Sequence, residues 1–153
     1  MDDNIAERAS KEHERYVADR DFNAKVIDEF RANDGVVGGD LEGAPLLLLT
    51  TKGAKTGHER ITPLVYLADG DRYIVFASAA GSPNHPGWYH NVIADPDVTV
   101  EVGSDKFKTR AKVINKPESV ELYERQVQLR PDFDVYRRVT TREIPVIALS
   151  QSN

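Results

Sequence analysis

Apolar residues recur at helical spacing near the start of the chain. Within residues 1–33, Phe22, Val26, Ile27 and Phe30 stand among charged residues of both signs, with no proline or glycine. This spacing predicts one or two amphipathic helices. We interpret the segment as a helix lying across the domain, with a lid or a membrane-surface helix as the alternative. Its nine acidic residues against six basic ones would repel anionic lipid, so any membrane contact is at most transient.

The pattern changes after a glycine-rich connection at residues 34–45. The continuous apolar run that follows suits a buried strand, and later segments alternate as half-buried strands do. Asp69-Gly70 and Gly103-Ser104-Asp105 are hairpin signals. The predicted strands span residues 46–51, 60–67, 73–77, 98–102, 107–113 and 144–149.

Two further helices are predicted between the strands. One covers residues 86–94, opened by Pro86 and stopped by Asp95-Pro96, and the other runs from Pro117 to about Leu129. Six mostly hairpin-linked strands with helices at the ends and in the connections indicate an α+β fold built on an antiparallel six-stranded barrel. The expected organisation is a single domain over residues 1–153, with residues 46–153 as its body.

Composition narrows the class of protein. The chain has 153 residues, a formal net charge of −5 and no cysteine. This length suits one soluble domain with its own core. The absence of cysteine excludes disulfide scaffolds, thiolate nucleophiles and cysteine-ligated zinc, and favours the cytosol. No apolar run approaches the length of a membrane span, and an acidic chain lacks the basic surface typical of nucleic-acid binding.

The loop between the first two predicted strands carries the most informative chemistry. Residues 50–60 contain three permanent cations, three hydroxyls and two glycines. Glycines let backbone amides approach a ligand, while hydroxyls and cations donate strong hydrogen bonds to an anion. The loop is not a nucleotide-binding P-loop, because His58 rather than lysine follows Gly57. Two interpretations stay open from the residues alone: an anion site, or a solvated turn with surface lysines.

A second stretch, residues 77–91, combines small residues leaving a strand with Trp88 and Tyr89 on the following helix. Small residues could make room for a planar ligand that Trp88 walls, although both aromatics could equally be core residues. His85 and His90 are five apart, and the chain has no HExxH motif, so no metal site is predicted. The absence of a GxSxG elbow disfavours serine hydrolysis.

At these two stretches the sequence resembles the deazaflavin-dependent nitroreductase family of actinobacteria, split-β-barrel enzymes that use reduced coenzyme F420. The resemblance runs from about residue 20 to the end. The matching features are residues 48–57, Arg60, Pro63-Leu64, Ala77-Ser78, Pro86, Trp88-Tyr89, Asn91, Asp95-Pro96 and the entry to the last strand at residues 142–145.

The resemblance implies an FMN-binding-like split barrel and a cofactor site for F420, whose phosphodiester and glutamate tail are negatively charged. Lys55 and Arg60 would hold the tail, residues 76–79 would run beneath the deazaflavin ring, and the pocket would be closed by Trp88, Tyr89 and Asn91. The implied cofactor-binding residues are Ala54, Lys55, Thr56, Arg60, Ile61, Thr62, Pro63, Leu64, Val65, Phe76, Ala77, Ser78, Ala79, Trp88, Tyr89 and Asn91.

The implied activity is hydride transfer from the reduced deazaflavin to a small electron-poor acceptor such as a quinone, a nitroaromatic or a conjugated lactone. Ser78 could donate a hydrogen bond to the acceptor oxygen, and Tyr136 is the candidate for orienting it or helping to deliver a proton. The sequence departs from the family pattern at Ala79, where a lysine can occur, and at Arg130 and Phe133, where tyrosines can occur.

Several alternatives stay open at this stage. An FMN-dependent oxidoreductase would share the fold, a non-enzymatic protein could store the deazaflavin, and the polar loop could be only a turn. The chain could be a monomer or a homodimer. The expected location is the cytoplasm or the inner face of the cell membrane.

Overall fold

The structure is a computed structural model, and it describes residues 20–151. The part of the predicted helical segment that precedes residue 20 lies outside the described residues. The helices are α2 (Arg20–Ala32), α3 (Gly87–Ala94), α4 (Glu118–Leu129) and α5 (Asp132–Val139), with short 3-10 turns η1 (Gly39–Leu41) and η2 (Ala79–Gly81). The strands are β1 (Leu46–Lys52), β2 (Glu59–Val65), β3 (Leu67–Asp69), β4 (Arg72–Phe76), β5 (Asp97–Val102), β6 (Asp105–Arg110), β7 (Lys112–Ile114) and β8 (Val146–Ser150).

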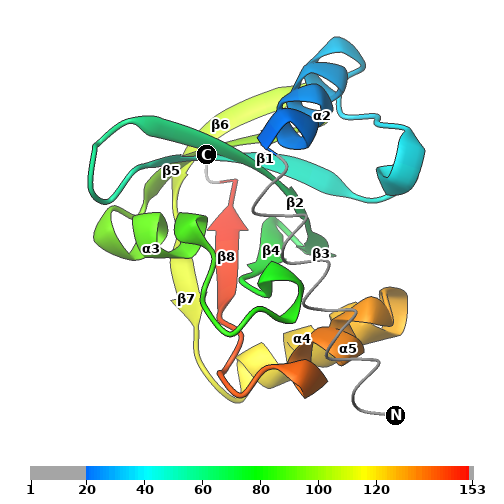
Figure 1. Cartoon of the computed structure of the whole chain (residues 1–153), viewed down its shortest axis with the longest axis vertical. Coiled ribbons are helices and arrows are strands. Elements are labelled where there is room, and N and C mark those ends of the chain that lie inside the picture. The colour runs from blue at the N-terminus through cyan, green and yellow to red at the C-terminus, as the bar shows by residue number, and fades with distance from the viewer. Residues whose placement is uncertain (1–19, 152–153) are drawn as a thin grey trace.

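The strands form two antiparallel four-stranded sheets, in the orders β2-β1-β5-β6 and β3-β4-β8-β7 (Figure 1). The prediction of an α+β fold with mostly antiparallel strands is confirmed, but the six-stranded barrel is not: the described chain has eight strands in two sheets and no closed barrel. Two predicted strands each divide between the sheets. The segment 60–67 breaks at Tyr66 into β2 and β3, and the segment 107–113 breaks at Ala111 into β6 and β7.

These two corners explain why the strand count differs. Tyr66 N–H donates to the carbonyl of Pro45 at 2.9 Å, and Ala111 N–H donates to the carbonyl of Pro96 at 2.8 Å, so each corner residue bonds outside the ladder of either sheet. A strand that bends from one sheet into another keeps its alternation of apolar and polar residues through the bend. The sequence pattern therefore predicts one strand where the structure has two.

Strand β1 is buried on both faces, as its apolar run predicts. Leu47 and Leu49 pack between the two sheets, whereas Leu46 and Leu48 pack under α2. The same holds for β8, whose Ile147 lies between the sheets while the alternate residues face α4 and α5. A strand covered on both faces needs apolar residues at every position.

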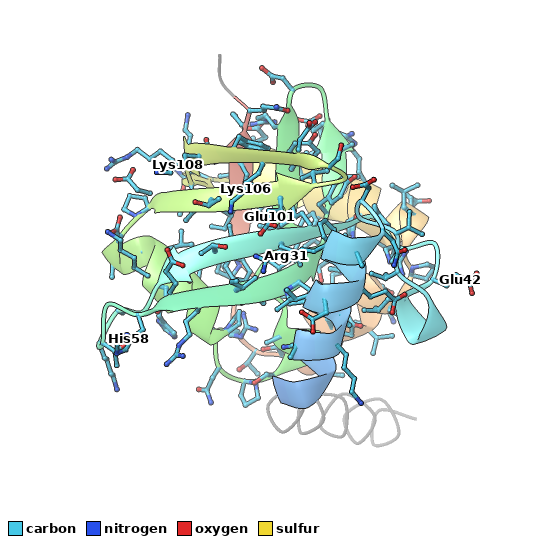
Figure 2. The ribbon with its side chains drawn as sticks, turned by 90° about the horizontal axis from the view of Figure 1, so that it is seen from above. Arg31, Glu42, His58, Glu101, Lys106 and Lys108 are labelled. Atoms are coloured by element: carbon cyan, nitrogen blue, oxygen red, sulfur yellow. The ribbon has the colours of Figure 1, made fainter. Side chains whose placement is uncertain are left out.

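Helix α2 lies across the outer face of the first sheet (Figures 1 and 2). Phe30 is 1% exposed and packs with Val26 against β1. Arg31 donates two hydrogen bonds to the two carboxylate oxygens of Glu101 on β5, at 3.0 and 2.9 Å. The interpretation of this segment as a helix lying across the domain is confirmed for residues 20–32. The bidentate pair fixes the end of α2 over the middle of the sheet.

Replacing Glu101 by glutamine should loosen this attachment. Glu101 is 9% exposed, but the Arg31 side chain is 44% exposed, which lowers the gain from the pair. We expect the free energy of unfolding to fall by about 1 kcal/mol, measured from the midpoint of urea unfolding. The matched control is Arg110→Met, which breaks the ion pair with Asp97 between side chains that are both 74% exposed; it should change stability by less than about 0.5 kcal/mol. Equal effects of the two substitutions would contradict the attachment.

Helices α4 and α5 lie side by side and cover the outer face of the second sheet (Figure 1). The buried hydroxyl of Tyr123 on α4 donates to the carbonyl of Phe133 on α5 at 2.7 Å. Helix α5 is not among the helices that the sequence pattern predicts. Pro131 opens it, acidic residues stand in its first turn and arginines in its last, which is the arrangement that the helix dipole favours. No helix within residues 20–151 is long and apolar enough to cross a membrane.

Candidate functional site

The polar loop between β1 and β2 is an ordered hairpin held against α3. Gly53 N–H donates to the carbonyl of His58 at 2.7 Å, and Gly57, with a φ of +73°, donates back to the Gly53 carbonyl at 2.8 Å. Asn91 accepts a hydrogen bond from Ala54 N–H at 2.9 Å and donates one to the Thr51 hydroxyl at 3.1 Å. The Asn91 side chain therefore joins the loop to α3 and sets the position of both.

The hairpin loop forms one wall of a cavity of about 710 Å³. Lys55 and Arg60 reach it from the hairpin and His90 from α3. Among the residues of 20–151 that line it, none is an aspartate or glutamate, although the whole chain carries a net charge of −5. The lining residues are Asn23, Ala24, Ile27, Gly53, Ala54, Lys55, Thr56, Arg60, Ile61, Thr62, Gly87, Trp88, His90 and Asn91. This cavity is suited to an anionic ligand. We call it the cationic cavity.

A second cavity, of about 290 Å³, continues along the same strand. Trp88 lines both cavities, and β2 passes from the first at Thr62 to the second at Pro63. The lining residues of the second are Leu41, Pro63, Leu64, Val65, Phe76, Ser78, Ala79, Ala80, Trp88, Arg130, Asp132, Phe133 and Tyr136. Most of these residues are apolar or aromatic; the polar ones are Ser78 and Tyr136, and Arg130 and Asp132 are charged. This composition suits a planar ligand, and we call it the apolar cavity.

One wall of the apolar cavity is a turn of unusual backbone conformation. Ala79 and Ala80 have φ values of 45° and 53°, and Gly81 follows at 83°. A left-handed conformation costs a residue other than glycine about 1–2 kcal/mol. Such conformations persist where the surrounding structure holds them, and they concentrate at functional sites.

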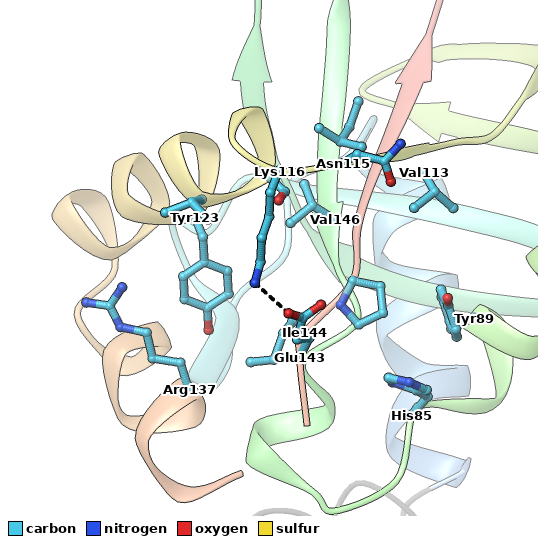
Figure 3. A pocket seen from close by; sticks show the side chains of 14 residues that line it. His85, Tyr89, Val113, Asn115, Lys116, Tyr123, Arg137, Glu143, Ile144 and Val146 are labelled. Atoms are coloured by element: carbon cyan, nitrogen blue, oxygen red, sulfur yellow. Dashed lines mark hydrogen bonds and ion pairs between the residues drawn. The ribbon is translucent and has the colours of Figure 1, made fainter. Parts of the chain in front are cut away.

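A third cavity, of about 440 Å³, opens on another part of the molecule. Figure 3 shows His85 and Tyr89 on one side of it and Tyr123 and Arg137 on the other. Lys116 and Glu143 form an ion pair there at 2.5 Å, and this pairing holds the pKa of the Glu143 carboxyl below its usual value.

The structure brings most of the expected site residues together, in two groups. Ala54, Lys55, Thr56, Arg60, Ile61, Thr62 and Asn91 line the cationic cavity, Pro63, Leu64, Val65, Phe76, Ser78, Ala79 and Tyr136 line the apolar one, and Trp88 lines both. Two expected residues lie elsewhere. Ala77 is fully buried in the core between the sheets, and Tyr89 lines the third cavity beside His85.

Comparison with known proteins identifies the family to which a chain with these two cavities belongs. The family model for F420H(2)-dependent quinone reductases matches residues 23–151, which contain all of the described residues that line the two cavities. The chain belongs to this family. The resemblance to F420-dependent reductases over almost the same range is therefore confirmed.

Individual members of the family of F420H(2)-dependent quinone reductases are similar along most of their length. One, from Mycobacterium tuberculosis, is 40% identical over 126 residues, which cover 80% of this chain and 85% of the relative. A solved structure of an F420-H2 dependent reductase is 34% identical, with a TM-score of 0.64, over 69% of this chain and 94% of that one. Another, described as a domain-swapped dimer, is 34% identical with a TM-score of 0.66 over 83% and 93% of the two chains.

The sequence pattern did not predict that α2 contributes to the cationic cavity. Asn23, Ala24 and Ile27 line it, yet they lie about thirty residues before the hairpin loop in the chain. Their polar and apolar pattern shows only that the helix is amphipathic, so no local signal identifies them. Ala80, in the left-handed turn, was also missed, because an alanine gives no sequence signal for a positive φ.

Proposed function

We propose that this protein is an F420H2-dependent reductase that transfers a hydride to a quinone. Membership of the F420H(2)-dependent quinone reductase family supports the activity. The single structural observation that carries the proposal is a pair of cavities that share Trp88 in their lining: a cationic one, with no acidic side chain among the described residues that line it, and a mainly apolar one. The coenzyme has the matching division into a polyanionic tail and a planar ring.

The residues of the cationic cavity would bind the tail of the coenzyme in different ways. Lys55 and Arg60 would bind the phosphodiester and the glutamate carboxylates of the tail with charge-assisted hydrogen bonds. Thr56 would add a hydroxyl donor. Asn91 acts indirectly, since its amide is already bonded to the hairpin loop and holds Ala54 in place.

The apolar cavity would hold the ring and the acceptor. Bound reduced F420 supplies the hydride, and conversion of a quinone to a hydroquinone requires this hydride and a proton. Ser78 and Tyr136 are the hydroxyl side chains lining the apolar cavity that could donate hydrogen bonds to a quinone oxygen as negative charge develops there. A bound ring would exclude water from the apolar part of the cavity, which strengthens these bonds.

The FMN alternative is not favoured. FMN carries one phosphate and no glutamate tail. The cationic cavity is therefore larger and more positively charged than FMN binding requires. The names of the relatives also specify F420H(2). Nitroaromatics and conjugated lactones fit the same apolar cavity and remain proposed acceptors beside quinones. A homodimer is proposed over a monomer, with the solved relative described as a domain-swapped dimer as its support.

A titration tests the cofactor assignment. The protein is titrated with oxidised F420 and, in parallel, with FMN, at low and moderate salt, and cofactor fluorescence reports binding. We expect saturable micromolar binding of F420 that weakens as salt rises, because salt screens exposed charges, and no comparable binding of FMN. Preference for FMN, or absence of binding to either, would refute the cofactor assignment. Oxidation of reduced F420 by 2-methyl-1,4-naphthoquinone then separates an enzyme from a storage protein.

A further inference from the structure

Arg142 stands four residues before β8, and its guanidinium donates hydrogen bonds to several backbone carbonyls. It donates to the carbonyls of Ala77 at 3.0 Å, Ser78 at 2.9 Å and Ser82 at 3.0 Å, and a fourth contact joins it to His85 Nδ1 at 2.9 Å. No carboxylate in residues 20–151 forms an ion pair with it, and burial lowers its pKa. The dipoles of these backbone carbonyls therefore stabilise the positive charge of the Arg142 guanidinium.

These carbonyls flank the left-handed turn on both sides. Ala77 and Ser78 precede it, Ser82 follows it, and Ala79 and Ala80 lie between with positive φ values. One rigid, planar group bonded at both ends of a turn fixes the distance between those ends. A point donor such as an ammonium group has no equivalent fork.

The turn is also packed against α5. A Cβ added to Gly81 would lie 2.5 Å from a methyl carbon of Val139 and 3.3 Å from the backbone of Tyr136. The turn is thus held by both α5 and the Arg142 guanidinium. Loss of the guanidinium would remove one of these two attachments while the contact with α5 stays.

The turn forms a wall of the apolar cavity through Ser78, Ala79 and Ala80, whereas Arg142 lines none of the three cavities described above. We propose that Arg142 is a positioning residue for the reduction: its guanidinium holds the turn in the conformation that places Ser78 at the apolar cavity. This inference rests on the proposed function, since it takes the apolar cavity as the place of hydride transfer.

His85 couples this arrangement to pH. The guanidinium donates permanently, so His85 Nδ1 must accept, and the imidazole is neutral when the contact is formed. Burial lowers the His85 pKa below its ordinary 6.5, and the positive charges of Arg142 and His90 lower it further. The Tyr89 ring contacts the His85 ring in a tilted arrangement, with 4.8 Å between the ring centroids, and Glu143 and Lys116 line the third cavity with them.

The sign of the pH effect follows from that lowered pKa. The folded state binds the proton less readily than the unfolded state, so the stabilisation is complete above pH 6.5 and is lost as pH falls through the folded-state value. Protonation at Nδ1 removes the acceptor and places a second cation beside Arg142. The turn should therefore loosen on the acid side.

The test compares Arg142→Lys and Arg142→Met with Arg138→Met, a control that removes an exposed arginine bonded to Asp134 on α5. Steady-state rates are measured with reduced F420 and 2-methyl-1,4-naphthoquinone, and F420 binding is measured separately. We expect kcat to fall about tenfold or more in both Arg142 variants while the F420 dissociation constant stays within about threefold, because the tail contacts lie in the other cavity. The control should match the unchanged protein in both quantities.

The lysine variant keeps the test informative if the methionine variant does not fold, and melting temperatures establish which is the case. A second measurement uses His85→Asn, whose amide oxygen can accept from Arg142 without titrating between pH 5 and 8. The acid-side decline of kcat/KM should flatten in this variant. Unchanged kcat in Arg142→Lys, a loss of F420 affinity as large as the loss of kcat, or an unaltered pH profile in His85→Asn would each overturn the proposal. Failure of the unchanged protein to bind F420 would instead refute the proposed function.

Discussion

Removal of both Lys55 and Arg60 by alanine substitution should weaken F420 binding by about a hundredfold or more. Each side chain would contribute one charge-assisted hydrogen bond to the tail, and losing one such bond costs about tenfold in the dissociation constant. Both side chains line the cationic cavity, and within residues 20–151 no carboxylate lines it whose repulsion the substitution would expose. The single variants should each lose about tenfold, and the two losses should be nearly additive.

The matched control removes two cations from the opposite edge of the same sheet. Lys106 and Lys108 lie on β6, across the sheet from the hairpin loop that His58 marks in Figure 2. Their double alanine substitution changes the net charge by the same amount as the Lys55 and Arg60 pair. Dissociation constants from fluorescence titration at low salt should separate the two double variants. If both lose affinity equally, the general charge of the protein, and not the cationic cavity, would account for binding.

Replacement of Trp88 by alanine should have the largest effect on stability. The indole is 4% exposed and packs with Leu47, Val92 and other residues of the core between the sheets. Truncation of a buried tryptophan to alanine typically costs about 3–5 kcal/mol. We expect a loss near the lower end, about 3 kcal/mol, because cavities on two sides give the surrounding residues room to relax.

The same substitution should also weaken F420 binding, since it removes a side chain that lines both cavities. Urea unfolding followed by circular dichroism measures the stability change without relying on the indole. Trp88→Phe is the control: it keeps an aromatic ring in the core, and it should retain most of the stability while losing part of the affinity. A stability loss below about 1 kcal/mol in Trp88→Ala would show that the indole does not pack as described.

The parts of the fold that sequence predicts best are those with a simple burial pattern. The leucine run of β1 must be covered on both faces, and the structure covers it with the second sheet on one face and α2 on the other. The helical spacing of Val26 and Phe30 likewise predicts the face of α2 that lies on the sheet. In both cases the pattern reports burial directly.

The parts that sequence misses depend on where the chain turns in space. Alternation continues through the corners at Tyr66 and Ala111, so it does not show that the strand changes sheets there. Helix α5 is eight residues long and follows α4 after only a short break at Arg130 and Pro131, and a segment so short and charged is hard to separate from a loop.

The candidate site likewise has a part that the sequence predicts and a part that it does not. The sequence predicts the hairpin loop as a binding element from its cations and glycines, which are local features. The wall from α2 and the left-handed turn at Ala79 and Ala80 come from tertiary packing: one needs a helix docked on the sheet, and the other is bonded by an arginine over sixty residues later. Neither can be deduced from its own segment.

Trp88 gives the protein a built-in optical probe. It is the single tryptophan of the chain, and its indole borders both cavities. Its emission therefore comes from one place, without background from other indoles. A molecule that enters either cavity alters the polarity and quenching around that one ring, so tail-like anions and ring-like acceptors can be titrated separately by the same signal, with no label attached.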